Sequence, residues 1–216
     1  MFMLFIYRDR RPPIFHAVEN GDTNAISQYL RLGSNVNTPV LSYPFGGSRD
    51  VPLLDIAVAN GRLEMVEFLL KNKANPNQSD YSGESPLNWV VGRIKNDVPI
   101  EQRLKVMKTL IASGADPNRK DSGPYGYTPL IHAAEFGELE MAKILLAAGA
   151  DINATNNKGM TALHFAASAE IARFLIGAGA DPNARTVGGE TPAQTAVRMR
   201  NLNALTVLTN GPVSKR

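Results

Sequence analysis

The sequence predicts an all-α fold, a solenoid of stacked helix-turn-helix units, and three observations lead to this prediction. Nearly the same phrase recurs, as in "VPLLDIAVANGRLEMVEFLLKNKANPN", "TPLIHAAEFGELEMAKILLAAGADIN" and "TALHFAASAEIARFLIGAGADPN". Within each phrase apolar residues recur at helical spacing, and glycines stand where helices should end. A repeat this short must stack on its neighbours to bury its apolar face.

The units can be aligned on the position that Pro holds in "TPL". About six units result, with steps of 40, 33, 43, 33 and 30 residues between Pro13, Leu53, Pro86, Pro129, Ala162 and Pro192. We interpret the long steps as insertions at 38–51 and around 93–103, and the short step as a lost glycine-containing turn. The repeats predict one domain over 13–210, preceded by a capping segment at 1–12 and followed by a tail at 211–216.

Each unit should open with a short first helix. Pro at the first helical position needs no hydrogen-bond donor, and small residues such as Ala133 and Ala134 allow neighbouring helices to approach closely. The preceding Ser or Thr can cap the first amides, at Ser85, Thr128, Thr161 and Thr191. A left-handed glycine should then end the helix, at Gly21, Gly61 and Gly137.

A second helix should follow in each unit, with apolar residues such as Leu139, Ala142 and Leu145 at helical spacing. It should stop at Gly33, Gly114, Gly149 or Gly179. The next residues read "NVN", "NPN", "DPN" or "DIN", and in such turns Asn and Asp side chains bond local backbone groups.

With these motifs the chain resembles the ankyrin repeat family, on "TPLIHAAEFG", "TALHFAA", "GADPN" and "GADIN", from about Pro13 to about Asn210. The first and last units are degenerate, as capping repeats should be. The resemblance implies helix pairs with β-hairpin fingers projecting at right angles. It also implies a concave side, lined by fingers and first helices, that binds a protein partner.

Composition narrows the possible functions. An apolar fraction of 44% and a charged fraction of 20% predict a folded chain, and the absence of cysteine excludes disulfides, thiolate catalysis and cysteine-based zinc sites. The opening "MFMLFIYRDRRPP" has apolar residues before basic ones, the reverse of a secretory signal, and is too short to span a bilayer. We expect a cytoplasmic chain without a membrane partner.

No residue pattern predicts catalysis. His16, His132 and His164 each lie near the start of a first helix, and the aspartates recur in "GAD" turns, so both sets should be structural. The resemblance implies that His164 bonds backbone of an adjacent unit. Nucleophile elbow, phosphate loop and zinc motif are all missing from the sequence. We therefore expect no enzyme activity, no cofactor and no metal.

The resemblance places partner-facing positions beside the finger glycines and at the ends of first helices. Together with the 38–51 insertion they give these protein-binding candidates: Tyr43, Phe45, Tyr81, Glu84, Arg93, Tyr125, Tyr127, Glu135, Phe136, Lys158, Met160 and Arg198. The aromatic residues are candidate anchors because rigid rings bury much area at low entropic cost, although single exposed aromatics are also ordinary. The insertion either folds back on the first unit or contacts a partner.

These observations predict a non-catalytic protein-binding module, monomeric when unbound, that acts as an inhibitor or immunity protein neutralising a toxin or effector. The alternatives are a general scaffold or regulatory adaptor, and a secreted effector acting on host proteins. An enzyme or small-ligand binder would need converging polar side chains near the first finger. A nucleic-acid partner is not expected, because the net charge is only +3 and basic residues alternate with glutamates on the candidate surface.

Overall fold

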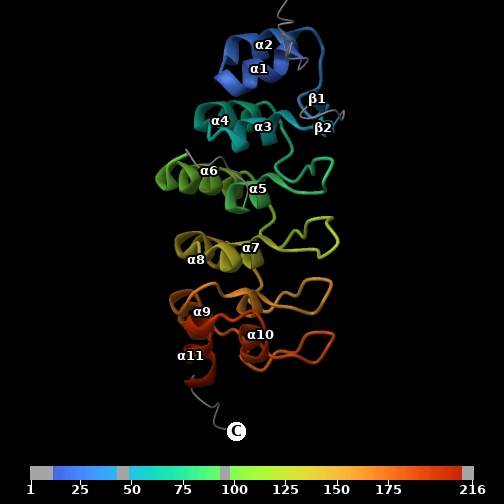
Figure 1. The fold of residues 1–216 in the computed structure, drawn as a ribbon. Helices are drawn as coiled ribbons and strands as arrows, with labels where there is room; N and C mark the ends of the chain where they lie inside the picture. The colour runs from blue at the N-terminus through green and yellow to red at the C-terminus, as the bar shows by residue number, and fades with distance from the viewer. Residues whose placement is uncertain (1–11, 43–48, 93–97, 211–216) are drawn as a thin grey trace, which may run out of the picture.

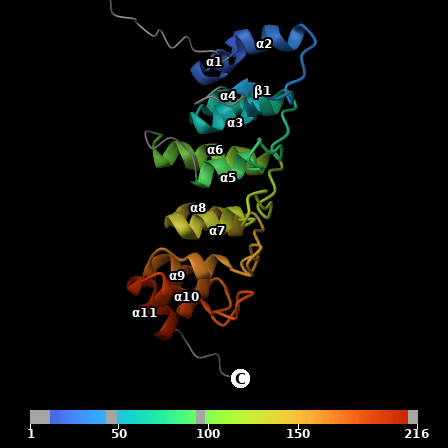
Figure 2. The same ribbon diagram turned by 45° about the vertical axis from the view of Figure 1, so that its right-hand side comes forward.

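The computed structural model describes residues 12–42, 49–92 and 98–210 of the chain. Helix pairs follow one another in a single column, and loops project from one edge of it, at the right in Figure 1. Figure 2 shows the same column turned by 45°. The predicted all-α solenoid is confirmed. Among the described residues no helix is both long and apolar enough to cross a membrane.

Six first helices and six second helices alternate along the described chain. The first helices are α1 (Pro13–Asn20), α3 (Leu53–Ala59), α5 (Pro86–Gly92), α7 (Pro129–Phe136), the 3₁₀ turn η1 (Ala162–Phe165) and α10 (Pro192–Arg198). The second helices are α2 (Thr23–Arg31), α4 (Leu63–Lys71), α6 (Ile100–Ala112), α8 (Leu139–Ala147), α9 (Ala169–Gly177) and α11 (Leu202–Asn210).

The helix ends follow the expected local chemistry. The side chain of Thr128 accepts a hydrogen bond from the backbone N–H of Ile131 at 3.3 Å, and Thr191 caps α10 in the same way. Gly21 and Gly137 hold left-handed backbones with φ of 79° and 72°. These observations confirm the predicted helix ends. The prediction was possible because each cap depends only on residues close in sequence.

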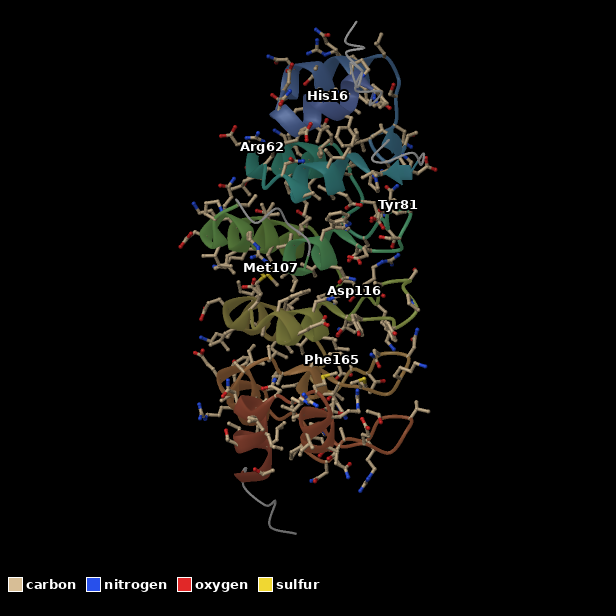
Figure 3. All side chains as sticks on the ribbon, in the orientation of Figure 1. His16, Arg62, Tyr81, Met107, Asp116 and Phe165 are labelled. Atoms are coloured by element: carbon tan, nitrogen blue, oxygen red, sulfur yellow. The ribbon has the colours of Figure 1, made fainter. Side chains whose placement is uncertain are left out.

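The core runs through the whole column between the helix layers. First helices supply small or branched residues such as Ala133, and the second helices supply Met65, Met107 and Met141, all buried. Figure 3 labels Met107 between the helix pairs of the third and fourth units. The methionines therefore fill core space, as expected of flexible apolar side chains.

The fifth unit shows the result of the lost turn. Its first helix is only the four residues of η1, and Ala166 leads out of it with φ −54° and ψ 106°. The backbone N–H of Ala167 then donates to the Ala134 carbonyl of the preceding unit at 3.0 Å. From the following unit, Asn201 Nδ2 donates to the Ala166 carbonyl at 2.9 Å. Neighbouring units thus provide the hydrogen bonds that a longer helix would have made.

The first insertion lies in the first finger. Strands β1 (Val40–Ser42) and β2 (Arg49–Val51) pair antiparallel, with Val40 opposite Val51. They form the only sheet among the described residues, so the other fingers are turns and the expectation of β-hairpins holds for this finger alone. Val40 is buried in the core, so the base of the finger folds onto the stack. Tyr43 and Phe45 lie outside the described residues.

The second insertion precedes a long second helix. Helix α6 has 13 residues, whereas α4 and α8 have nine each. Arg103 anchors it: Nη1 lies 3.0 Å from Glu138 Oε1, and Nη2 donates to the Val91 carbonyl at 3.1 Å. Arg93 lies outside the described residues.

The turns between units carry hydrogen bonds of two kinds. Local bonds are present as predicted, for example from Asn118 N–H to Asp116 Oδ1 at 2.8 Å. The last Asn of the turn, however, also reaches the next unit: Asn118 Nδ2 donates to the Gly149 carbonyl at 3.0 Å, and its Oδ1 accepts from Asp151 N–H at 2.7 Å. Asn77 repeats both bonds one unit earlier. These Asn side chains join successive units.

Candidate functional site

The fingers and the adjoining first helices present most of the predicted contact positions along one edge of the column. Tyr81 lies on this finger side in Figure 3, and Tyr81, Tyr125 and Phe136 are among the exposed large apolar side chains. Lys158 and Arg198 are exposed as well, and Glu135 is half-buried. Arg198 Nε lies 3.1 Å from Glu190 Oε2, which makes it part of an exposed ion pair.

Two predicted contact residues, Glu84 and Met160, do not lie on the surface. Their exposed fractions are 4% and 9%, so they are withdrawn from the binding candidates. Both residues close a finger: the N–H of Glu84 donates to Asp80 Oδ1, and the N–H of Met160 donates to Asn156 Oδ1, each at 3.0 Å. This five-residue turn brings the side chain that follows the finger glycine inward, against the stack.

The fingers are held to one another by backbone hydrogen bonds. The N–H of Asn157 donates to the Tyr125 carbonyl at 2.7 Å, and the N–H of Val187 donates to the Lys158 carbonyl at 2.8 Å. Gly159 has no space for a side chain, because a Cβ there would lie 2.9 Å from the Val187 nitrogen. The central fingers therefore form a connected edge.

An aromatic cluster joins the fourth unit to the fifth. Tyr125 stacks on Tyr127 with ring centroids 5.7 Å apart and planes 17° apart, and His132 stacks on Phe136 at 6.0 Å and 12°. Tyr127 also makes T-shaped contacts with His132 and Phe165, with ring centroids 5.2 Å and 5.1 Å apart. We call these five side chains the aromatic cluster. Its outer rings, Tyr125 and Phe136, are exposed by 49% and 53%.

Three members of the aromatic cluster are predicted from the sequence, whereas His132 and Phe165 are missed. A signal for both exists. Each stands three residues after the first residue of its first helix, at Pro129 and Ala162, so the repeat alignment places them in equivalent positions of adjacent units. Equivalent positions in a stack lie side by side.

Two carboxylates flank the ring of His132. Its Nε2 lies 3.3 Å from Asp121 Oδ2, and its Nδ1 lies 3.7 Å from Glu135 Oε2. Nearby, burial raises the pKa of the Tyr127 hydroxyl, and the negative charge of Glu135 raises it further. The aromatic cluster is therefore an electronegative environment. His132 has this polar pairing in place of the backbone contact that His164 makes.

The other histidines lie apart from it. His164 Nε2 is 3.2 Å from the Glu190 carbonyl in the finger before α10, which confirms its structural role, and burial lowers its pKa and favours the neutral ring. His16 Nδ1 lies 3.6 Å from Glu19 Oε2. In the described ranges no group of three or more His, Cys, Asp or Glu side chains is arranged to hold a metal ion.

A groove of about 460 Å³ lies on the opposite edge of the column, between the α1–α2 turn and the starts of α4 and α6. Arg62, one of its lining residues, is labelled on that edge in Figure 3. The groove is thus not the cleft near the first finger that a small-ligand binder would need. Arg62 and Gln102 both use their side chains to bond backbone carbonyls of neighbouring units.

A buried carboxylate that the sequence did not single out lies in α3. Asp55 is 1% exposed, and neither carboxylate oxygen has a hydrogen-bond partner within the described part of the chain. Burial raises its pKa well above the usual range, and the nearby charges of Asp80 and Glu84 raise it further. Asp55 lies in α3, whereas Asp80 and Glu84 lie in the finger before α5, so only the fold brings them together.

Comparison with known proteins gives consistent results. A family model described as "Ankyrin repeats (3 copies)" matches residues 14–121 and 98–186. The chain is 28% identical over 162 residues to "Ankyrin repeat protein nuc-2" of Neurospora crassa, covering 75% of this chain and 14% of that protein. It is 37% identical over 107 residues to "Putative ankyrin repeat protein YahD" of Escherichia coli, covering 49% of each. The chain thus spans only part of these relatives.

Among solved structures, a chain in the complex of the endopeptidase Bd0816 of Bdellovibrio bacteriovorus with the immunity protein Bd3460 superposes with a TM-score of 0.72. Identity is 26%, and the match covers 92% of this chain and 97% of that one. An ankyrin repeat domain of Acinetobacter baumannii matches with a TM-score of 0.69 and 28% identity, covering 91% and 96%. Both similarities extend over almost the full length of the two chains compared.

Proposed function

This chain belongs to the ankyrin repeat family, whose domains are generally non-catalytic interaction modules, and from that premise we propose that it binds and neutralises a protein partner. In this proposal it is an inhibitor or immunity protein, and the partner is a toxin or effector. The contact surface consists of the fingers and the ends of the first helices, centred on the aromatic cluster.

The observation that carries this proposal is the exposure of stacked rings on a connected scaffold. Tyr125 and Phe136 each present ring surface to solvent while a second ring supports them from behind. Aromatic side chains held in this way dominate many protein interfaces, because they bury large areas and lose little freedom on binding. A purely structural role would not need two rings half exposed at the outer end of the aromatic cluster.

The similarity to a chain in an endopeptidase–immunity protein complex supports the inhibitory part of the proposal. Because that similarity covers nearly all of both chains, it concerns the whole stack and not one repeat. A partner enzyme of this chain is therefore the first kind of target to test, and a scaffold or adaptor would bind its partner without changing the partner's activity.

The proposal can be tested by affinity purification from native lysate at low salt, with mass spectrometry of the retained proteins. The matched control is a bait with Tyr125→Ala and Phe136→Ala. A protein retained by the wild-type chain alone should lose activity when the purified chain is added. Retention without inhibition would replace the inhibitor by an adaptor, and repeated failure to retain any protein would contradict partner binding.

A further inference from the structure

We propose that the aromatic cluster receives an arginine side chain of the protein partner. The guanidinium would lie against the exposed rings and pair with the carboxylate of Glu135. This inference rests on the proposed function, since it assigns the chemistry of the partner residue that the same surface binds.

The first argument is the preorganised ring surface. The two stacked pairs lie almost perpendicular to each other, because the planes of Tyr127 and His132 meet at 83°. Each exposed ring therefore keeps its orientation through contact with an inner ring. The face of an aromatic ring carries partial negative charge, so fixed and exposed ring faces attract a cation.

The second argument is the charge around these rings. In the described ranges, the ion-pair contacts of Asp121 and Glu135 are both to His132, and neither carboxylate lies within ion-pair distance of a lysine or arginine. The Asp121 side chain is only 8% exposed, whereas that of Glu135 is 37% exposed. Glu135 is thus the carboxylate that a partner can reach.

The third argument excludes an apolar partner residue. An apolar side chain laid over Phe136 would remove water from Glu135 without replacing its hydrogen bonds, and burying an unpaired charge is strongly unfavourable. A cation satisfies both the rings and the carboxylate. Lys158 is exposed on the next finger and repels a cation. The favourable position of the cation is therefore beside Glu135, in the fourth unit.

Arginine fits these groups better than lysine does. A guanidinium is planar and can stack on one ring while two of its N–H groups reach a carboxylate. The ammonium of lysine is a compact, strongly hydrated charge that cannot do both in this way. Glu135 and Phe136 provide an acceptor and a ring at the same place, because both contact His132: Glu135 Oε2 lies 3.7 Å from its Nδ1, and the Phe136 ring stacks on it.

The direct test is an NMR titration of the purified chain with N-acetyl-arginine methylamide. Saturable chemical-shift changes are expected for the ring protons of Phe136 and Tyr125. Glu135→Gln should raise the dissociation constant of the probe by about threefold. The matched control is Glu140→Gln, an exposed glutamate on the outer helix α8 that pairs with Lys143, and it should change nothing. Higher salt should weaken the binding.

One neutral and one cationic analogue of the arginine probe make the result decisive with the wild-type chain alone. N-acetyl-citrulline methylamide has the shape of arginine without its charge, and equal shifts with it would overturn the proposal. N-acetyl-lysine methylamide should bind more weakly, and equal affinity would overturn the choice of arginine. The absence of saturable shifts at Phe136 and Tyr125 would also overturn it.

The inference and the proposed function can fail separately. If a captured partner binds Glu135→Gln as tightly as wild type, the function stands and the arginine contact is wrong. The expected result is a loss of at least about tenfold for Glu135→Gln, with Glu140→Gln unchanged. If the arginine probe binds but no partner is retained, the site stands and the proposed function fails.

Discussion

The backbone carbonyl of Lys73 accepts a hydrogen bond from Asn37 Nδ2 at 3.0 Å, and Lys73 holds a left-handed backbone with φ of 68°. At the equivalent place other units have glycine, including Gly33 and Gly114 with φ of 84° and 90°. The turn requires this backbone conformation in order to present its carbonyl to the preceding unit. Lys73 therefore adopts it without the freedom of glycine.

Replacing Lys73 by glycine should stabilise the chain by about 0.5–1 kcal/mol, because a side chain in the left-handed region is strained. Urea denaturation followed by circular dichroism measures the change. The matched control is Gly114→Ala, at a site with open space around a new Cβ, and it should destabilise the chain by a similar amount. A loss of stability in Lys73→Gly would contradict the strain argument.

Replacing Asn118 by alanine should destabilise the chain by about 1–3 kcal/mol. The change removes the donor to the Gly149 carbonyl and the acceptor for the Asp151 N–H. Thermal unfolding is a suitable measurement. Asn203, exposed in α11, offers the control, and Asn203→Ala should stay within about 0.5 kcal/mol of wild type. Equal effects at the two sites would mean that the bond between units contributes nothing.

Stability should fall with rising pH because of Asp55. Burial, followed by the charges of Asp80 and Glu84, raises the pKa of Asp55 in the folded state. A raised folded pKa contributes stability that is complete below the unfolded pKa, about 3.9, and is lost as pH rises through the folded pKa. Asp55→Asn should therefore stabilise the chain at neutral pH.

The measurement is urea unfolding at a series of pH values from acid to neutral. Asp55→Asn should flatten the decline in stability above the unfolded pKa, while Asp50→Asn, an exposed aspartate in β2, should leave it in place. If the wild-type and Asp55→Asn curves run parallel across this range, Asp55 is not the group responsible.

The fold could be predicted in detail because its signals are local. A capping Thr128 and a left-handed Gly137 lie within one helix length of each other, and each acts through its own backbone. The contact surface could be predicted only in part. Glu84 was predicted on the surface, but the side chain of Asp80 accepts a hydrogen bond from the N–H of Glu84, closes the finger and turns the Glu84 side chain inward.

Groups that meet across units carried no local signal. Asp55 in α3 meets the charges of Asp80 and Glu84 from the finger before α5, and its polar side chain stands where the repeat pattern places a core residue. His132 and Phe165 are brought together with Tyr127 by the stacking distance between helices, which no single repeat specifies. Such contacts depend on the pairing of units: an alignment of the repeats places His132 and Phe165 in equivalent positions, but the spacing within one repeat does not reveal which side chains touch.

Within the aromatic cluster, Phe136 and Tyr127 are both predicted contact residues, but replacing Phe136 should affect mainly binding and replacing Tyr127 mainly stability. Phe136→Ala should change unfolding by less than about 1 kcal/mol, because the ring is exposed, yet weaken partner binding by about 2 kcal/mol or more. Tyr127→Ala should destabilise the chain by about 1–3 kcal/mol, since its ring contacts Tyr125, His132 and Phe165. Urea unfolding and titration of the captured partner measure the two effects. If Phe136→Ala unfolds the chain as readily as Tyr127→Ala does, the outer ring belongs to the core, and the aromatic cluster has lost its exposed contact surface.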